Sequence, residues 1–159
     1  MYKKIALFLA IMILGGCAIK PKNIKSKSYL VTFKFANIKF SDVGFLNTGK
    51  NYTNIQVFSA GTPLIDLKIQ NQVCVDYFCM GKSNFNEEYL SPSYPNKIME
   101  NILNGKPIFN SKNIIKTQDG FTQKLEDKNY KIIYKITQEK IYFKDFKNKI
   151  LIKLKIIRN

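Results

Sequence analysis

Three cysteines are the most reactive side chains in this 159-residue chain, which contains no histidine and no tryptophan. Without histidine the chain cannot build the Ser/His, Cys/His or His-ligated metal sites on which most hydrolases and zinc enzymes depend. Cys17 follows an apolar segment near the N-terminus, whereas Cys74 and Cys79 lie close together in mid-chain. The sequence therefore predicts covalent modification or a disulfide rather than catalysis, and we expect no enzyme, no metal site and no cofactor.

The segment before Cys17 has the layout of a bacterial signal peptide, residues 1–16. Two lysines precede an apolar run from Ile5 to Leu14, and two glycines then lead to the cysteine. Ten apolar residues at about 1.5 Å each cover about half of a hydrocarbon core roughly 30 Å thick, which is too short for a membrane-spanning helix. The stretch Leu14–Cys17 resembles the bacterial lipobox. That resemblance implies cleavage before Cys17 and its modification by lipid, palmitate included; an ordinary signal peptide with an accidental cysteine is the alternative.

Residues 17–28 are predicted to be the lipidated cysteine and a flexible tether, because residues 18–28 are polar, basic and poor in large apolar groups. By resemblance to the sorting rule of enteric bacteria, Ala18 in place of aspartate implies the outer membrane, and we expect its periplasmic face. The formal charge of +15 indicates an anionic partner such as a phospholipid surface, although a lysine-rich coding bias would give the same number. Nucleic acid is not expected, since an envelope anchor keeps the protein away from it.

Cys74 and Cys79 are predicted to form a disulfide, because an exported protein meets an oxidising compartment. On one straight strand two cysteines five residues apart would point to opposite faces, so bonding them requires the chain to turn between them. The prediction is therefore a tight loop. Two reduced, buried cysteines remain the alternative.

The remaining residues, 29–159, carry alternating apolar patterns that predict half-buried strands. A turn or bulge is expected near Ala36-Asn37, and one helix with Ser93 as N-cap and Gly105 beyond its end is expected between the two groups of strands. Three antiparallel strands, apolar on one face and basic on the other, should end the chain. The predicted fold class is mainly β (α+β): a curved antiparallel sheet or half-barrel with one short helix packed on it and an N-terminal lipid tether. The alternating positions are Val31, Phe33, Phe35; Ile55, Val57; Ile65, Leu67, Ile69; Tyr130, Ile132, Tyr134, Ile136; Ile141, Phe143; and Ile150, Ile152, Leu154, Ile156.

This order of tether, strands, single helix and strands on a lipidated cysteine resembles LolB, the outer-membrane lipoprotein receptor, whose fold is shared with the soluble carrier LolA. The most specific similarity is in the strands at 129–134 and 149–155, with weaker similarity at 102–107 and at 59–64. The family's exposed loop carries a protruding leucine before a glycine. Here that position is Ala60, and the family pattern lacks the Cys74/Cys79 pair.

The resemblance implies a monomer that accepts acyl chains of other lipoproteins from a LolA-like carrier and helps insert them in the outer membrane. It also implies an apolar acyl-chain cavity and a membrane-delivery loop. An apolar sheet face filled by side chains would give the same sequence pattern, so a structural or assembly lipoprotein that docks on an envelope complex is the alternative function. The cavity residues would be Phe33, Phe35, Ile55, Val57, Ile65, Leu67, Ile69, Ile132 and Tyr134, and the loop residues Phe58, Ala60, Gly61 and Leu64.

Overall fold

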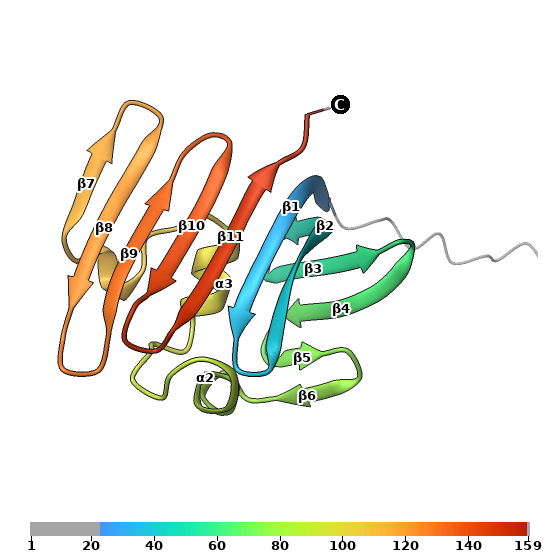
Figure 1. Ribbon diagram of the computed structural model, residues 1–159, viewed down its shortest axis with the longest axis horizontal. Coiled ribbons are helices and arrows are strands. Elements are labelled where there is room, and N and C mark those ends of the chain that lie inside the picture. The colour runs from blue at the N-terminus through green and yellow to red at the C-terminus, as the bar shows by residue number, and fades with distance from the viewer. Residues whose placement is uncertain (1–22, 159) are drawn as a thin grey trace, which may run out of the picture.

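A single curved sheet of eleven antiparallel strands dominates the computed structural model, which describes residues 23–158 (Figure 1). The N-terminal strands follow one another as neighbours, and short turns such as the predicted one at Ala36-Asn37 join them. These strands are β1 (Lys25–Phe35), β2 (Ile38–Gly49), β3 (Tyr52–Ser59), β4 (Thr62–Ile69), β5 (Val73–Val75) and β6 (Phe78–Met80).

The C-terminal strands form a second series that returns to the first strand. They are β7 (Ile114–Thr117), β8 (Gly120–Glu126), β9 (Lys131–Ile136), β10 (Lys140–Asp145) and β11 (Ile150–Ile156). The last strand pairs with the first, so that the order is β6-β5-β4-β3-β2-β1-β11-β10-β9-β8-β7. The three predicted C-terminal strands are confirmed as β9, β10 and β11, and the mainly β, curved antiparallel fold is confirmed with them.

The sheet bends strongly at β2, so that β3 and β4 run across the direction of β7–β11 (Figure 1). Gly44 lies within β2, opposite Tyr29 of β1 and Val57 of β3. A Cβ at this position would approach the carbonyl oxygen of Gln56 to 2.7 Å and the side chains of Val31 and Val57 to 3.0 Å, so only glycine lets β1 and β3 come this close.

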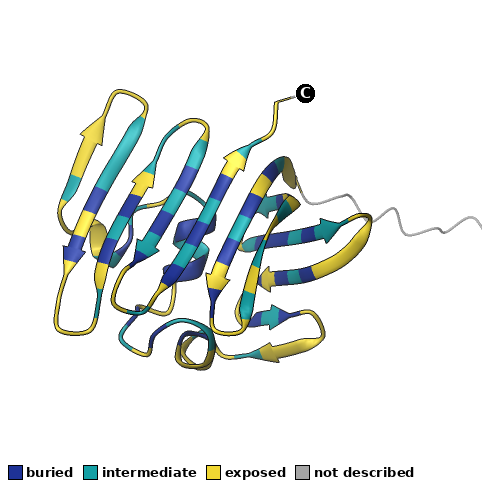
Figure 2. Cartoon of the chain, viewed as in Figure 1, coloured by how far each residue is buried: buried dark blue, intermediate teal, exposed yellow. Residues whose placement is uncertain are grey.

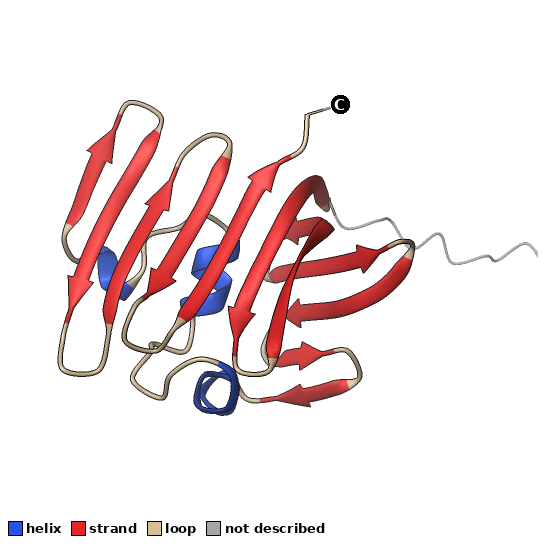
Figure 3. Ribbon diagram, viewed as in Figure 1, coloured by secondary structure: helices blue, strands red, loops and turns tan. Residues whose placement is uncertain are grey.

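Between the two series of strands, residues 81–113 form a helical segment that covers one face of the sheet (Figure 3). It contains α2 (Lys82–Tyr89), α3 (Ile98–Leu103) and the short turn η2 (Phe109–Ser111). The prediction of one helix is therefore corrected to two.

The predicted ends of the helix differ in outcome. Ser93 is not an N-cap, because α3 begins only at Ile98, with Lys97 at its N-cap and no side-chain cap. The Ser93 hydroxyl lies 2.9 Å from that of Ser91 instead, in the turn that precedes α3. Gly105 follows α3 with a φ of +62°, as its predicted role requires.

The core lies between the helical segment and the sheet, and buried positions alternate along each central strand (Figure 2). One cluster of buried apolar side chains joins both layers, and its members lie between Tyr29 and Leu154. The helical segment contributes Phe85, Tyr94, Ile98, Met99, Ile102, Leu103 and Ile108. A chain that starts at residue 18 therefore retains this entire core.

The stretch predicted as a tether, residues 17–28, overlaps a strand. Residues 25–28 belong to β1, where Lys25 pairs with Thr48 and Ser28 with Phe45. The polar composition of these residues concealed the strand, because their side chains are mostly exposed. Cys17 and the predicted signal peptide lie outside the described residues. Within residues 23–158, no helix has the length and apolar character needed to cross a membrane.

Candidate functional site

The nine residues predicted to line an acyl-chain cavity all lie in the buried core. Their exposed fractions do not exceed 4%, so they are almost inaccessible to water. They share one cluster with Ile98, Met99 and Ile102 of α3. In this structure the helical segment covers them, and an acyl chain could reach them only if that segment moved. They are Phe33, Phe35, Ile55, Val57, Ile65, Leu67, Ile69, Ile132 and Tyr134.

A few polar contacts fix the helical segment on the sheet. The side chain of Gln123 in β8 accepts a hydrogen bond from the backbone N–H of Ile108 (2.9 Å) and donates one to its carbonyl (3.0 Å). Asn104 donates to the hydroxyl of Thr53 (2.7 Å), and the Tyr134 hydroxyl donates to the carbonyl of Lys106 (3.0 Å). Asn104 and Lys106 directly follow α3, so their hydrogen bonds hold its C-terminal end against the sheet.

Asp145 forms a second polar anchor, at the end of β10. Its buried carboxylate accepts hydrogen bonds from the Tyr94 hydroxyl and from the backbone N–H groups of Lys131 (3.0 Å) and Lys147 (2.9 Å). Burial raises the pKa of this carboxyl group, but the hydrogen bonds from Tyr94, Asn148 and the two backbone groups outweigh burial and lower the pKa below its usual value. Burial, and the hydrogen bond to the negatively charged Asp145, raise the pKa of the Tyr94 hydroxyl.

At one end of the core the sheet and α3 leave a pocket of about 300 Å³, called here the mouth pocket. Its apolar walls come from β1, β2, α3, β9 and β10, and Lys25 and Lys27 lie at its rim. The wall residues are Tyr29, Leu46, Leu103, Ile136 and Ile141. Such a pocket is at the lower end of the size range of ligand sites, and it lies directly against the buried core.

The predicted delivery loop is the β3–β4 hairpin. Its two-residue turn is Ala60-Gly61, and both residues have positive φ (46° and 83°), as this kind of hairpin turn requires. Phe58 is half-buried and Leu64 is exposed. The structure thus brings the four predicted loop residues together, with Leu64 as the exposed bulky side chain.

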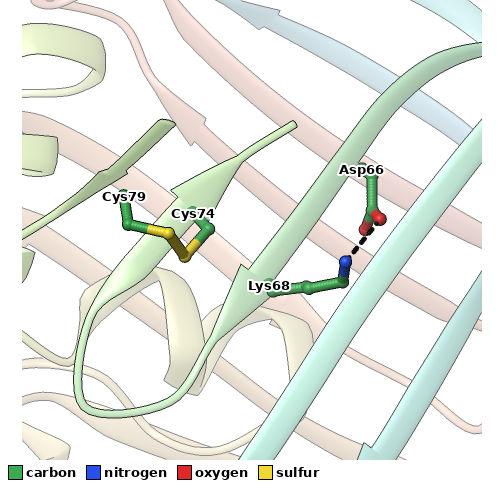
Figure 4. The surroundings of a disulfide bond; sticks show 4 residues. All are labelled: Asp66, Lys68, Cys74 and Cys79. Atoms are coloured by element: carbon green, nitrogen blue, oxygen red, sulfur yellow. Dashed lines mark ion pairs between the residues drawn. A yellow bond between two sulfur atoms is a disulfide. The ribbon is translucent and has the colours of Figure 1, made fainter. Parts of the chain in front are cut away.

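The second hairpin beside it, β5–β6, contains the predicted disulfide. Cys74 and Cys79 lie opposite each other on the two strands and are bonded, next to the Asp66–Lys68 ion pair of β4 (Figure 4). The prediction of a disulfide across a tight turn is confirmed. Tyr77 in this turn is 97% exposed.

Between the two hairpins lies a groove of about 570 Å³, called here the hairpin groove. Its apolar wall includes Phe58, Leu64, Tyr77 and Phe78, and Phe78 is 76% exposed. Large aromatic side chains exposed to this extent usually mark an interaction surface. The hairpin groove is therefore the second candidate site, after the mouth pocket.

The disulfide should stabilise the β5–β6 hairpin modestly. Closing so short a loop contributes about 2 kcal/mol on the entropy model, so replacing both Cys74 and Cys79 by serine should lower the melting temperature by several degrees. Circular dichroism melts of the oxidised protein and of the double variant measure the shift.

Alkylation followed by mass spectrometry should find neither thiol modified in the native exported protein. Full alkylation of both thiols without reductant would contradict the bond.

The chain matches no protein-family model, and no curated protein matches it. Within residues 23–158, no group of three or more histidine, cysteine, aspartate or glutamate side chains could hold a metal ion.

Sequence reasoning missed the residues that fix the helical segment and the mouth pocket. Gln123 is in phase with Phe121 and Leu125, and Asp145 is in phase with Ile141 and Phe143. Their place among the inward positions was the available signal. Tyr77 and Phe78 stand between the two cysteines, so the predicted turn already implied that they are exposed. The mouth pocket had no signal in the sequence, because five separate elements form it.

Proposed function

We propose that this protein is a lipid-anchored, outer-membrane lipoprotein that accepts acyl chains of other lipoproteins and helps insert them in the membrane. The observation that carries the proposal is the mouth pocket, an opening between α3 and the curved sheet that is lined by both polar and apolar residues and adjoins a continuous apolar core. Each acyl CH₂ group buried there contributes about 0.8 kcal/mol, so binding needs no cofactor and no covalent step.

The acyl chain would enter beside Leu103 and continue between α3 and the sheet. Its full length needs more space than about 300 Å³, so α3 must shift away from the strands. The polar contacts of this six-residue helix are the Lys82–Glu100 ion pair (2.8 Å) and, just beyond its C-terminal end, the hydrogen bonds of Asn104 and of the Lys106 carbonyl. Lys25 and Lys27 at the rim suit the anionic end of a lipid.

Filling the mouth pocket should weaken acyl binding without unfolding the protein. Leu46→Trp places a larger side chain in the pocket, and we expect at least about tenfold weaker binding of a fluorescent fatty acid, since several CH₂ contacts are lost. The chain from residue 18 is titrated in solution, and circular dichroism verifies that the variant is folded.

Val43→Trp is the matched control, because Val43 is exposed on the outer face of the same strand. It should bind the fatty acid like the unmodified chain. Absence of saturable binding by the unmodified chain at high micromolar fatty acid would contradict the receptor function.

A second function, docking on an envelope complex without lipid transfer, is favoured by the exposed aromatic side chains of the hairpin groove. Tyr77 and Phe78 expose apolar surface to water, which is unfavourable, and a protein partner would bury that surface. The closed core beneath α3 also suits a docking module. Fatty-acid binding by the unmodified chain that is weakened in Leu46→Trp would support the receptor function. Absence of such binding would support the docking function.

A further inference from the structure

The outer face of the sheet, opposite the helical segment, is rich in lysine. Inward and outward residues alternate along β8–β11, β1 and β2, and the strand registers place the outward residues side by side. We call this surface the lysine face. Its lysines are Lys34, Lys39, Lys124, Lys131, Lys135, Lys140, Lys144, Lys153 and Lys155. Among the outward positions of these described strands, Glu126 is the one acidic residue, and it pairs with Lys131 at 3.0 Å.

Two pairs of these lysines lie directly opposite each other. Lys140 faces Lys155, and Lys34 faces Lys39. Like charges directly opposite on neighbouring strands destabilise a sheet, and the described part of the chain gives none of these four an ion-pair partner. Folding therefore does not account for this arrangement, whereas an external anionic surface would neutralise it.

Apolar side chains lie among the lysines. Ile133 and Tyr142 line a shallow pocket of about 390 Å³ together with Lys135 and Lys140. The Lys140 ammonium group lies 4.9 Å from the centre of the Tyr142 ring. A surface of half-buried apolar groups with lysine ammonium groups above them suits the headgroup region of a bilayer, where the stems contact lipid and the charges contact phosphate.

We propose that the lysine face docks the domain on an anionic phospholipid surface. The proposal rests on the proposed function, because an acylated Cys17 would hold Lys25 within about 29 Å of the bilayer, the greatest length of the eight peptide units between them. Charge complementarity selects this occupant: the lysine face has nine lysines against Glu126, whereas the four lysines of the helical segment stand against Glu87, Glu88 and Glu100. A docked sheet would leave the helical segment facing away from that membrane.

The test uses the unacylated chain from residue 18, so that a missing anchor cannot be mistaken for a failed surface. Its binding to vesicles of equal parts phosphatidylcholine and phosphatidylglycerol is measured by sedimentation, at low and at high salt. Each lysine near an anionic surface contributes about fivefold, so the triple variant K135Q/K140Q/K155Q should bind on the order of 100-fold more weakly. High salt should weaken binding of the unmodified chain as well.

The matched control is K97Q/K106Q/K112Q, which removes the same charge from exposed positions of the helical segment. It should lose only a few-fold, and both variants should keep the circular dichroism of the unmodified chain. Equal losses in the two triple variants, or no binding of the unmodified chain at low salt, would overturn the proposal. Tighter binding to a single-stranded oligonucleotide, lost in K135Q/K140Q/K155Q, would assign the face to nucleic acid and overturn it too.

Discussion

Replacing Asp145 by alanine should lower the free energy of unfolding by about 3 kcal/mol, because several buried donors lose their acceptor at once. The Tyr94 hydroxyl and the N–H groups of Lys131 and Lys147 all donate to this carboxylate. Tyr94 belongs to the helical segment and Lys131 to β9, so the substitution loosens the segment and the sheet together. Urea denaturation monitored by circular dichroism measures the change in the free energy of unfolding.

Asp119→Ala is the control for this substitution. Asp119 lies in the exposed turn between β7 and β8, and it accepts a single long hydrogen bond from Thr117 (3.4 Å). Its removal should change the free energy of unfolding by no more than about 0.5 kcal/mol. Equal stability of the two variants would show that the Asp145 contacts do not hold the helical segment.

The lowered pKa of Asp145 adds a dependence on pH. In the unfolded chain an aspartate titrates near about 3.9, and in the folded protein Asp145 titrates below that value. The stability that it contributes is therefore fully present above about pH 4 and is lost as the pH falls through the folded pKa. Asp145→Asn should remove this part of the acid sensitivity, measured as the slope of unfolding free energy against pH.

The strands were predictable where one face is apolar and the other is not. Ile132 and Tyr134 alternate with Lys131 and Lys135. In a strand this period of two puts both apolar side chains on the buried face and both lysines on the other. The helix α2 was not predictable in this way. Its sequence KSNFNEEY is mostly polar and has no apolar stripe, and only Phe85 and Asn86 are buried, so packing rather than periodicity defines it.

Whether the apolar face is filled or hollow could not be predicted from the strands. Val57 or Ile132 has the same alternating pattern in either case, and the answer depends on the volume of the helical segment that crosses the sheet. Ile98 and Met99 fill space that the strands alone leave open. The disulfide was predictable because Cys74 and Cys79 have few other partners, whereas their position beside the hairpin groove depends on the pairing of β4 with β5.

Replacing Cys17 by serine should abolish lipid attachment completely. In the lipobox pattern the cysteine sulfur accepts the diacylglyceryl group, and a serine hydroxyl does not substitute for it in this reaction. Cells fed radiolabelled palmitate should show no label in the variant, and its gel mobility should be that of the precursor that retains residues 1–16. Both readouts are all-or-none, unlike the stability changes above.

The control for Cys17→Ser is the double variant Cys74→Ser/Cys79→Ser, which loses both other thiols and should incorporate palmitate like the unmodified protein. Membrane fractionation alone would not decide the question, since an uncleaved apolar segment and the lysine face could both retain the precursor at a membrane. Label and processing together isolate the anchor. Palmitate incorporation by Cys17→Ser would refute the lipobox interpretation, and it would also remove the proposed limit of about 29 Å between Lys25 and a bilayer.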